Sequence, residues 1–304
     1  MLHEIFYWIF NMSITASITG VLVMFVRLVK RIPRRLTVFL WIIPFFRMTV
    51  PLGLNSPYSL MSLLSEITTK AIVVYQLSQD MSFSIMNSVM AADTYFPITY
   101  KMSIFDKIFN VASVIWIIVS LAILLMLAVT YLTTINEIKD SILWKDNIYF
   151  SKKVGSPAVY GIVKPKIILP ISYKDKETEL VILHEKMHVS RLDNLWRIIA
   201  FVITAVHWFN PLCWMFLKEL LTDIELSCDE RVLMNLGTER AKEYALSLLD
   251  SKKGITVFAS AFGGARIRTR IENILGFERL TGLSLIMFVV LIISIFYVLL
   301  TNAG

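Results

Sequence analysis

The segment LHEKMHV, residues 183–189, places two of the four histidines of the chain four residues apart, with a glutamate directly after the first. On a helix, this spacing puts His184 and His188 on one face, where both imidazoles can reach a single Zn²⁺ ion. Glu185 is turned by about 100° from His184, to the rim of such a site, where its carboxylate can take a proton from water held by the metal. Because so short a pattern also arises by chance, the rest of the sequence must decide its meaning.

The composition is that of a membrane protein. Of the 304 residues, 56% are hydrophobic and 17% are charged, and the mean hydropathy is +0.67. Soluble domains carry about 25% charged residues, so much of this chain must face lipid. The N-terminus has neither a basic leading region nor a small-residue cleavage site, which favours a permanent membrane segment over a secretory signal. We expect Cys213 and Cys228 to be buried on helices without forming a disulfide.

Four stretches are long and apolar enough to cross about 30 Å of hydrocarbon. They are residues 5–26, 36–54, 109–132 and 283–301. The second contains Arg47, and a charge at that depth is costly unless it faces a protein partner or reaches the interface. The link between the first two spans, RLVKRIPRR (27–35), is strongly basic and is therefore expected in the cytoplasm.

This orientation fixes the rest of the topology. Both termini lie outside, residues 1–134 form a membrane domain that includes an extracellular segment, 55–108, and residues 283–304 hold the last span with a short outside tail. Residues 135–282 form a cytoplasmic domain between the third and fourth spans. The sequence thus predicts a mainly α membrane protein with four transmembrane helices and one inserted α+β domain.

Within 135–282, β-like runs come first and helices follow. Residues 147–154 and 158–169 read as strands, and Gly161 and Pro165 in the second run suit an edge strand or hairpin. The helix that carries LHEKMHV can be capped by Asp175 or Thr178. Two further helices are predicted at 195–209 and 212–236, the latter ending before Gly237.

A catalytic zinc needs a third protein ligand and one open position. The candidates are His207 and the acids of TDIELSCDERVL (222–233), in which Glu225 and Asp229 are four apart and share a helix face. His207 lies in the apolar stretch AVHWFNP, so we expect a hydrogen-bonded histidine at a helix interface rather than a ligand. The remaining acids nearby are expected to be surface charges; these are Glu219, Asp223 and Glu230.

The Glu225–Asp229 pair is similar to that of gluzincin metallopeptidases, in which a glutamate ligand is followed four residues later by an aspartate that hydrogen-bonds the first zinc histidine. The resemblance implies Glu225 as the third ligand and Asp229 behind His184. A carboxylate in that position fixes the histidine tautomer and raises its basicity.

Several blocks together resemble the BlaR/MecR-type integral-membrane zinc metallopeptidases, the antirepressor proteases of bacterial β-lactam resistance. They are SPAVYGIVKPKIILP (156–170), LVILHEKMHVSRLDNLWR (180–197), VHWFNPLCW (206–214), DIELSCDERVL (223–233) and AFGGARIRTRIENIL (261–275). The resemblance implies a gluzincin-like domain with Zn²⁺ bound by His184, His188 and Glu225, and with Glu185 as general base and acid.

It also implies a function: a regulated endopeptidase of the bacterial cell membrane, which cuts itself, a cytoplasmic repressor-like partner, or both, in the control of antibiotic-resistance or stress genes. The strand at 158–169 would then bind substrate by β-addition. A separate sensor or a second copy of the chain are further expected partners. No direct nucleic-acid contact is expected, because the basic run 266–270 is read as a cytoplasmic mark that contacts lipid headgroups.

One departure from the family is large. Its sensors carry an extracellular penicillin-binding domain after the fourth span, whereas these 304 residues contain no Ser-x-x-Lys acylation motif. We therefore expect a shortened or sensorless relative, in which 55–108 is either the signal input or a connecting loop. Two other readings stay open: a housekeeping or prenyl-peptide type membrane protease, and a non-catalytic receptor or scaffold with a structural metal. The intact Glu185 favours an enzyme.

Overall fold

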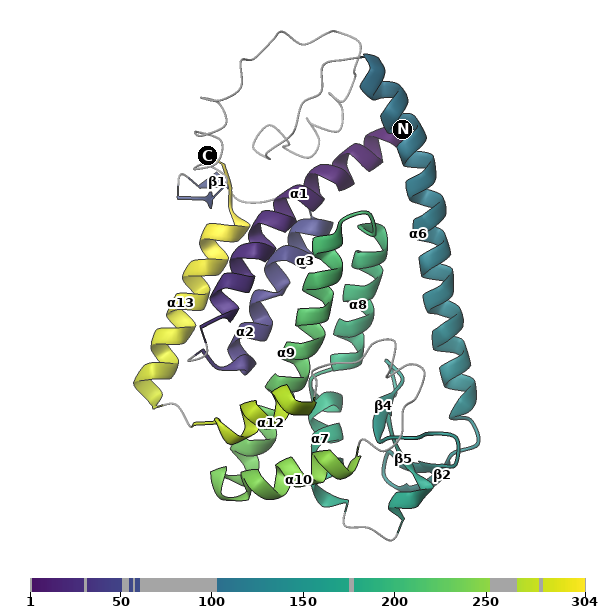
Figure 1. Cartoon of the computed structure of the whole chain (residues 1–304), viewed down its shortest axis with the longest axis vertical. Helices are drawn as coiled ribbons and strands as arrows, with labels where there is room; N and C mark the ends of the chain where they lie inside the picture. The colour runs from purple at the N-terminus through teal and green to yellow at the C-terminus, as the bar shows by residue number, and fades with distance from the viewer. Residues whose placement is uncertain are drawn as a thin grey trace.

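The computed structural model describes residues 2–29, 32–50, 55–56, 58–60, 103–174, 178–251, 267–278 and 281–303. Most of the segment predicted to be extracellular, 55–108, lies outside these residues, as does Asp175, one of the two predicted helix caps. Both ends of the chain lie at one end of the molecule, and the four-stranded sheet lies with α7, α10 and α12 at the other (Figure 1).

Three described helices are long and apolar enough to cross a membrane: α1 (Leu2–Arg27), α6 (Ser103–Glu137, with the candidate span at Ile108–Glu137) and α13 (Gly282–Leu300). They coincide with the predicted spans 5–26, 109–132 and 283–301. Helices α1 and α13 belong to the central bundle, whereas α6 runs along one side of the molecule (Figure 1). The protein is thus a mainly helical membrane protein.

The predicted span 36–54 differs from a single helix. Its described part forms α2 (Arg34–Leu40) and α3 (Ile42–Thr49), with a break at Trp41. The break has a local cause: Pro44 has no backbone N–H to donate to Leu40, four residues earlier. Whether α2 and α3 together cross the membrane stays a prediction.

Arg47, on α3, is fully buried. A buried charge within a membrane is costly in free energy unless it has a partner, and Arg47 has one in the protein. Its Nε donates to Leu299 O at 3.1 Å and its guanidinium donates to Thr301 O at 2.6 Å. These carbonyls belong to the C-terminal end of α13, where a helix leaves acceptors unpaired. Arg47 therefore joins α3 to the end of the last helix.

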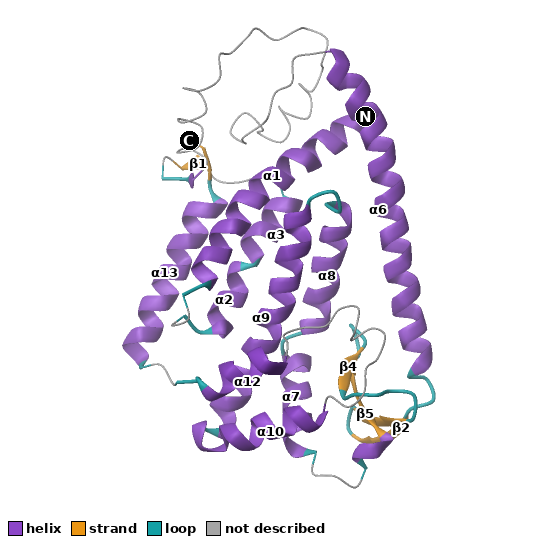
Figure 2. Cartoon of the chain, in the orientation of Figure 1, coloured by secondary structure: helices purple, strands orange, loops and turns teal. Residues whose placement is uncertain are grey.

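The sheet has the order β2-β3-β5-β4. Its strands are β2 (Ile142–Lys145), β3 (Ile148–Ser151), β4 (Ala158–Tyr160) and β5 (Lys166–Pro170), with β3 parallel to β5 and the other pairs antiparallel. A second, two-stranded pair joins β1 (Asn55–Ser56) to β6 (Asn302–Ala303) near the C-terminus (Figure 2). The predicted strand 158–169 is thus the β4–β5 hairpin, with β4 at the edge of the sheet.

Gly161, directly after β4, has a φ of +89°, and a Cβ there would meet Lys164 O at 3.1 Å. Its place in the turn therefore favours glycine. The edge strand is also fastened from outside, because Asn194 Nδ2 donates to Val159 O at 2.9 Å and to Gly161 O at 3.3 Å. Two carbonyls at this edge are consequently already paired.

The helical part begins with α7 (Glu179–Ser190), which carries LHEKMHV, and continues through α8 (Asp193–Val206) and α9 (Pro211–Leu236) to α10 (Ala241–Ser251) and α12 (Ile267–Leu275). Two short 3₁₀ turns lie at Ile171–Tyr173 and Thr238–Arg240. The predicted helices around LHEKMHV, at 195–209 and at 212–236 are confirmed. Thr178 occupies the N-cap position of α7, but its side chain makes no capping hydrogen bond to the helix.

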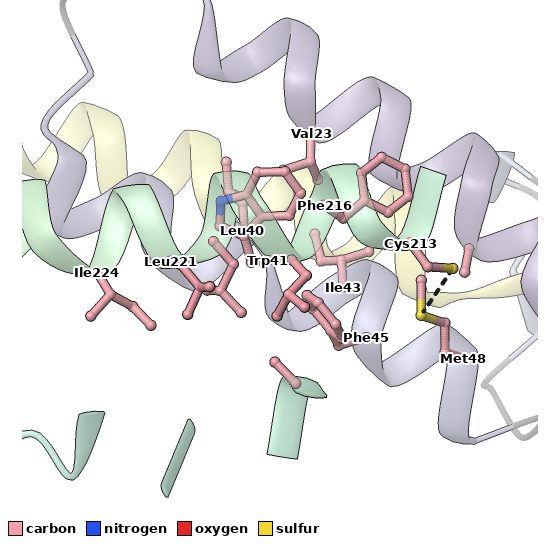
Figure 3. Close-up of a cluster of buried hydrophobic side chains, with 14 of the residues drawn as sticks. Val23, Leu40, Trp41, Ile43, Phe45, Met48, Cys213, Phe216, Leu221 and Ile224 are labelled. Atoms are coloured by element: carbon pink, nitrogen blue, oxygen red, sulfur yellow. Dashed lines mark hydrogen bonds between the residues drawn. The ribbon is translucent and has the colours of Figure 1, made fainter. Parts of the chain in front are cut away.

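One hydrophobic cluster unites helices from both halves of the chain. It contains residues of α1, α2, α3, α8, α9 and α13, among them Val23, Trp41 and Phe216 (Figure 3). Helices α1 and α9 approach so closely that a Cβ on Gly20 would lie 2.3 Å from the Phe216 ring. The α8–α9 hairpin is therefore part of the same bundle as α1, α3 and α13.

The tip of this hairpin is fastened by Asn210. Its Oδ1 accepts from Leu212 N at 3.0 Å and caps α9, while its Nδ2 reaches Ser13 Oγ and Ser17 Oγ on α1, both at 2.7 Å. Two indole groups pair with carbonyls of the tip: Trp116 Nε1 donates to Val206 O at 2.7 Å, and Trp214 Nε1 donates to Trp208 O at 3.0 Å.

Two acids on α9 that were expected at the surface are buried, so that expectation was wrong. Asp223 is fully buried and accepts from Arg27 Nε at 2.8–2.9 Å and from Trp41 Nε1 at 2.8 Å. Glu230 is 5% exposed and accepts from the backbone N–H groups of Arg34 at 2.9 Å and Arg35 at 3.0 Å. The reason is that α1 and α2 cover this face of α9.

Replacing Asp223 by Asn removes the charge that balances Arg27 at nearly unchanged volume. We expect the free energy of unfolding to fall by about 3 kcal/mol, because breaking the buried ion pair leaves Arg27 with the partly exposed Glu219 in place of a fully buried partner. Tryptophan fluorescence during denaturant unfolding in detergent measures this change. The matched control is Glu219→Gln, whose carboxylate is partly exposed and also contacts Arg27; its loss should stay below about 1 kcal/mol. Equal losses in the two variants would contradict a special role for Asp223.

Candidate metal centre

Three potential ligand side chains converge where α7 meets α9. His184 Nε2 lies 3.1 Å from His188 Nε2, and Glu225 offers Oε2 at 3.8 Å from the first and Oε1 at 3.6 Å from the second. Tetrahedral zinc with bonds of about 2.0–2.2 Å separates its ligand atoms by about 3.3–3.6 Å. The three separations bracket that range, so these residues fit an ion of this size.

The orientation of His188 is set by Asp193 at the start of α8. His188 Nδ1 lies 2.6 Å from Asp193 Oδ2, and Asp193, which is 2% exposed, also faces Arg191 Nε at 3.3 Å. A carboxylate only accepts, so we assign the ring proton to Nδ1. His188 Nε2 consequently points into the site with a free lone pair.

His184 reaches its carboxylate through a tyrosine. Tyr244 Oη donates to Asp229 Oδ1 at 2.6 Å and lies 2.8 Å from His184 Nδ1. Because its own proton is engaged, Tyr244 accepts the Nδ1 proton of His184, which leaves Nε2 unprotonated. Asp229 lies behind His184 with a direct Nδ1–Oδ1 distance of 3.5 Å, and the tyrosine hydroxyl bridges the two.

Two arginines supply positive charge beside the carboxylates. Arg270 makes a bidentate pair with Asp229 at 2.7 and 2.8 Å, and its other nitrogen lies 3.2 Å from Glu225 Oε2. Arg197 donates to Glu225 Oε1 at 2.5 Å. Burial alone would raise the pKa of Glu225, but the histidines when they are protonated, together with the permanent cations Arg270 and Arg197, hold it well below its ordinary value. Glu225 therefore remains a carboxylate.

Glu185 is 7% exposed and lies on the same helix as the two histidines. Burial raises the pKa of its carboxyl above the ordinary value and nearby Glu225 acts in the same direction, against the opposing fields of His184 and Arg197. A carboxyl group shifted toward neutral pH is suited to proton transfer in both directions.

A second donor set is present at the same place. Cys228 forms a compact group with His184 and His188, with donor atoms within 4.8 Å of one another. However, its Sγ lies 3.5 Å from Nδ1 of His184, the nitrogen already bonded to Tyr244. Burial, with the adjacent carboxylates, also raises the pKa of the Cys228 thiol well above its usual range. The Nε2 atoms converge on Glu225 instead, so the geometry favours the carboxylate as third donor.

His207 lies at the other end of α8 from this centre. It is 1% exposed, and its Nε2 is 3.0 Å from Met48 O on α3. The expectation of a hydrogen-bonded histidine at a helix interface is therefore confirmed. Both cysteines are buried and free, as expected.

Comparison with known proteins identifies the family to which this chain belongs. The profile of the BlaR1 peptidase M56 family matches residues 7–274, which include every residue of the centre. The chain belongs to the M56 peptidase family. This is a family of metallopeptidases, in agreement with the convergence of His184, His188 and a third donor.

Two of the similar proteins are named as regulatory proteins and one as a methicillin resistance protein. The chain is 31% identical to "Regulatory protein BlaR1" of Bacillus licheniformis over 159 residues, which are 48% of this chain and 26% of the relative. It is 27% identical to BlaR1 of Staphylococcus aureus over 241 residues, 69% of this chain and 41% of the relative. It is 34% identical to "Methicillin resistance mecR1 protein" of Staphylococcus aureus strain Mu50 over 106 residues, which are 34% of this chain and 18% of the relative. The matched part spans less than half of each relative.

Sequence reasoning missed four residues of this M56 centre. They are Asp193, Arg197, Tyr244 and Arg270. Asp193 had a usable signal, since an acid five residues after the second histidine falls in the first turn of the next helix. Arg270 belongs to the basic run that was expected to contact lipid headgroups, and that expectation was wrong for this residue, which is 8% exposed and paired with Asp229. Nothing in the sequence around Tyr244 sets it apart.

Replacing Tyr244 by Phe removes the hydroxyl between His184 and Asp229. We expect zinc affinity to fall about 10- to 100-fold, because the Nδ1 proton of His184 loses its acceptor. Competition with a chromophoric chelator in detergent measures this affinity. Tyr58→Phe is the control, since Tyr58 is 78% exposed and follows β1, the strand that pairs with β6 at the C-terminal end of the chain. Unchanged affinity in Tyr244→Phe would show that the hydroxyl does not support the histidine.

Proposed function

We propose that the chain is an integral-membrane zinc endopeptidase of the signal-transduction type. His184, His188 and Glu225 would hold the ion, with Asp229 behind His184 and Glu185 as general base and acid. The observation that carries this proposal is the convergence of two unprotonated Nε2 atoms and one carboxylate within 3.1–3.8 Å. Two imidazole nitrogens and one carboxylate are the ligand set of a catalytic zinc. In the structure, the Arg270 guanidinium also lies 3.2 Å from both His184 Nε2 and Glu225 Oε2.

When bound, zinc supplies Lewis-acid chemistry that polarises a peptide carbonyl and makes water more acidic. The proton transfers fall to Glu185. Its carboxylate takes a proton from the attacking water and later delivers it to the leaving amine, so that the C–N bond breaks and a carboxylate and an amine are released. The raised pKa of Glu185 suits both steps.

The proposed orientation puts the metal centre in the cytoplasm of a bacterial cell, with both termini outside. The basic link after α1 supports it: Arg27 and the first residues of α2 contact Asp223 and Glu230 on α9, the helix that carries Glu225. Positive residues at membrane boundaries are enriched on the cytoplasmic side.

The proposed substrates are a cytoplasmic repressor-like protein and the chain itself, in control of antibiotic-resistance or stress genes. The names of the relatives, a regulatory protein and a methicillin resistance protein, support this substrate class. Signal input would come through residues 55–108, a separate sensor or a second copy of the chain.

Metal content tests the donor set. By elemental mass spectrometry of detergent-purified protein, we expect about one zinc per chain in the wild type and most of it lost in Glu225→Ala, since a catalytic site needs three protein ligands. Cys228→Ser is the matched control and should keep its zinc. The opposite pattern would make Cys228 the ligand, and a folded wild type without zinc would favour a non-catalytic scaffold.

Peptide cleavage tests the role of Glu185. In Glu185→Gln we expect zinc to stay bound while cleavage of the chain or of a co-expressed repressor-like protein falls about 10²- to 10⁴-fold, the usual contribution of a general base. His184→Ala should lose both zinc and cleavage. Immunoblots of tagged proteins give the cleavage rates. Processing by Glu185→Gln at the wild-type rate would refute this mechanism.

A further inference from the structure

A narrow apolar slot lies between the α2–α3 segment and the α8–α9 hairpin. It has a volume of about 200 Å³ and is lined by Trp41 and Phe45 on one side, by Ile199 and Ile203 of α8 on the other, and by Ile224 of α9. Trp41, Phe45 and Ile224 are drawn in Figure 3 as part of the bundle core. The slot thus runs along the helical bundle, and one end of it reaches Asp193, the residue that supports His188.

The slot opens to the outer surface of the bundle. Three of its lining side chains are large, apolar and exposed: Phe39 by 46%, Trp196 by 49% and Ile199 by 38%. In a membrane protein, such a surface contacts acyl chains, and tryptophans gather at the level of the headgroups. Trp196 lies one turn into α8, close to its charged start at Asp193.

The lining of the slot also contains two arginines, Arg191 and Arg231, and one acid. That acid, Asp193, is already engaged by His188 Nδ1 and Arg191 Nε. Arg231 Nε is buried and has no hydrogen-bond partner among the described residues. Arg231 also lies in the repulsive fields of Arg191 and Arg35, and Asp193 is the carboxylate whose attractive field opposes them there. This end of the slot therefore carries excess positive charge and a donor without an acceptor.

We propose that the slot binds one anionic phospholipid, with an acyl chain between α3 and α8 and the phosphate between Arg191 and Arg231. The apolar walls and the cationic end match the two parts of such a molecule. A free phosphate would leave the apolar walls unused.

Native mass spectrometry of the full chain tests this inference. The protein is exchanged into detergent with phosphatidylglycerol and phosphatidylcholine of matched acyl chains, and retained lipids are counted as activation increases. We expect one phosphatidylglycerol to persist after phosphatidylcholine is lost. Arg231→Gln should lower its retention at least threefold, whereas Arg268→Gln, with an 88% exposed side chain, should not. The readout is lipid retention, so it does not depend on protease activity.

A second variant separates the acyl slot from the charge. Ile199→Trp fills the mouth of the slot and leaves both arginines in place, so we expect the same loss of phosphatidylglycerol. It also decides the question if Arg231→Gln does not fold. Equal retention of the two lipids, equal retention by the variants and wild type, or displacement of the lipid by millimolar inorganic phosphate would each overturn the proposal.

Discussion

Buried carboxylates on opposite faces of α9 determine how the two halves of the chain are joined. Asp223 and Glu230, seven residues apart, lie on one face, and Glu225 and Asp229, four apart, lie on the other. A buried carboxylate is costly unless it is paired and hydrogen-bonded. The first face therefore binds the α1–α2 segment, and the second binds α7 and α12, through Arg27 and Arg270 among others. One helix thus sets the position of the metal centre relative to the membrane helices.

The two histidines of the centre are supported in different ways, and both ways have the same consequence. His188 donates directly to Asp193, whereas His184 donates to Tyr244, which donates in turn to Asp229. Each arrangement holds a proton on Nδ1 and directs the lone pair of Nε2 into the site. The supports come from three elements, α8, α9 and α10, so the ligand geometry depends on the tertiary fold. This explains why a five-residue motif alone cannot define such a centre.

Part of the metal centre could be predicted from helical spacing. The four-residue spacing of His184 and His188 gave the helix and their shared face. Which faces become buried could not be predicted, because an acid at a given helical position looks the same whether it meets water or an arginine. That is why Asp223 was placed at the surface and Arg270 at the membrane boundary. The break at Trp41 could not be predicted from hydropathy, because hydropathy is averaged over a stretch of residues. The break depends instead on a single backbone donor that is missing at Pro44.

The turn between α8 and α9 needs hydrogen-bond partners for its backbone groups, and residues of the turn itself supply several of them. A turn packed against apolar helices takes backbone groups away from water, and each group left unpaired is costly. The block VHWFNPLCW supplies partners at this point. Asn210 caps α9 and reaches two serines on α1, Pro211 removes one N–H at the first helical position, and Trp214 pairs with a carbonyl of the tip. The turn can therefore sit inside the bundle, which lets α9 begin among the membrane helices and end at the metal centre.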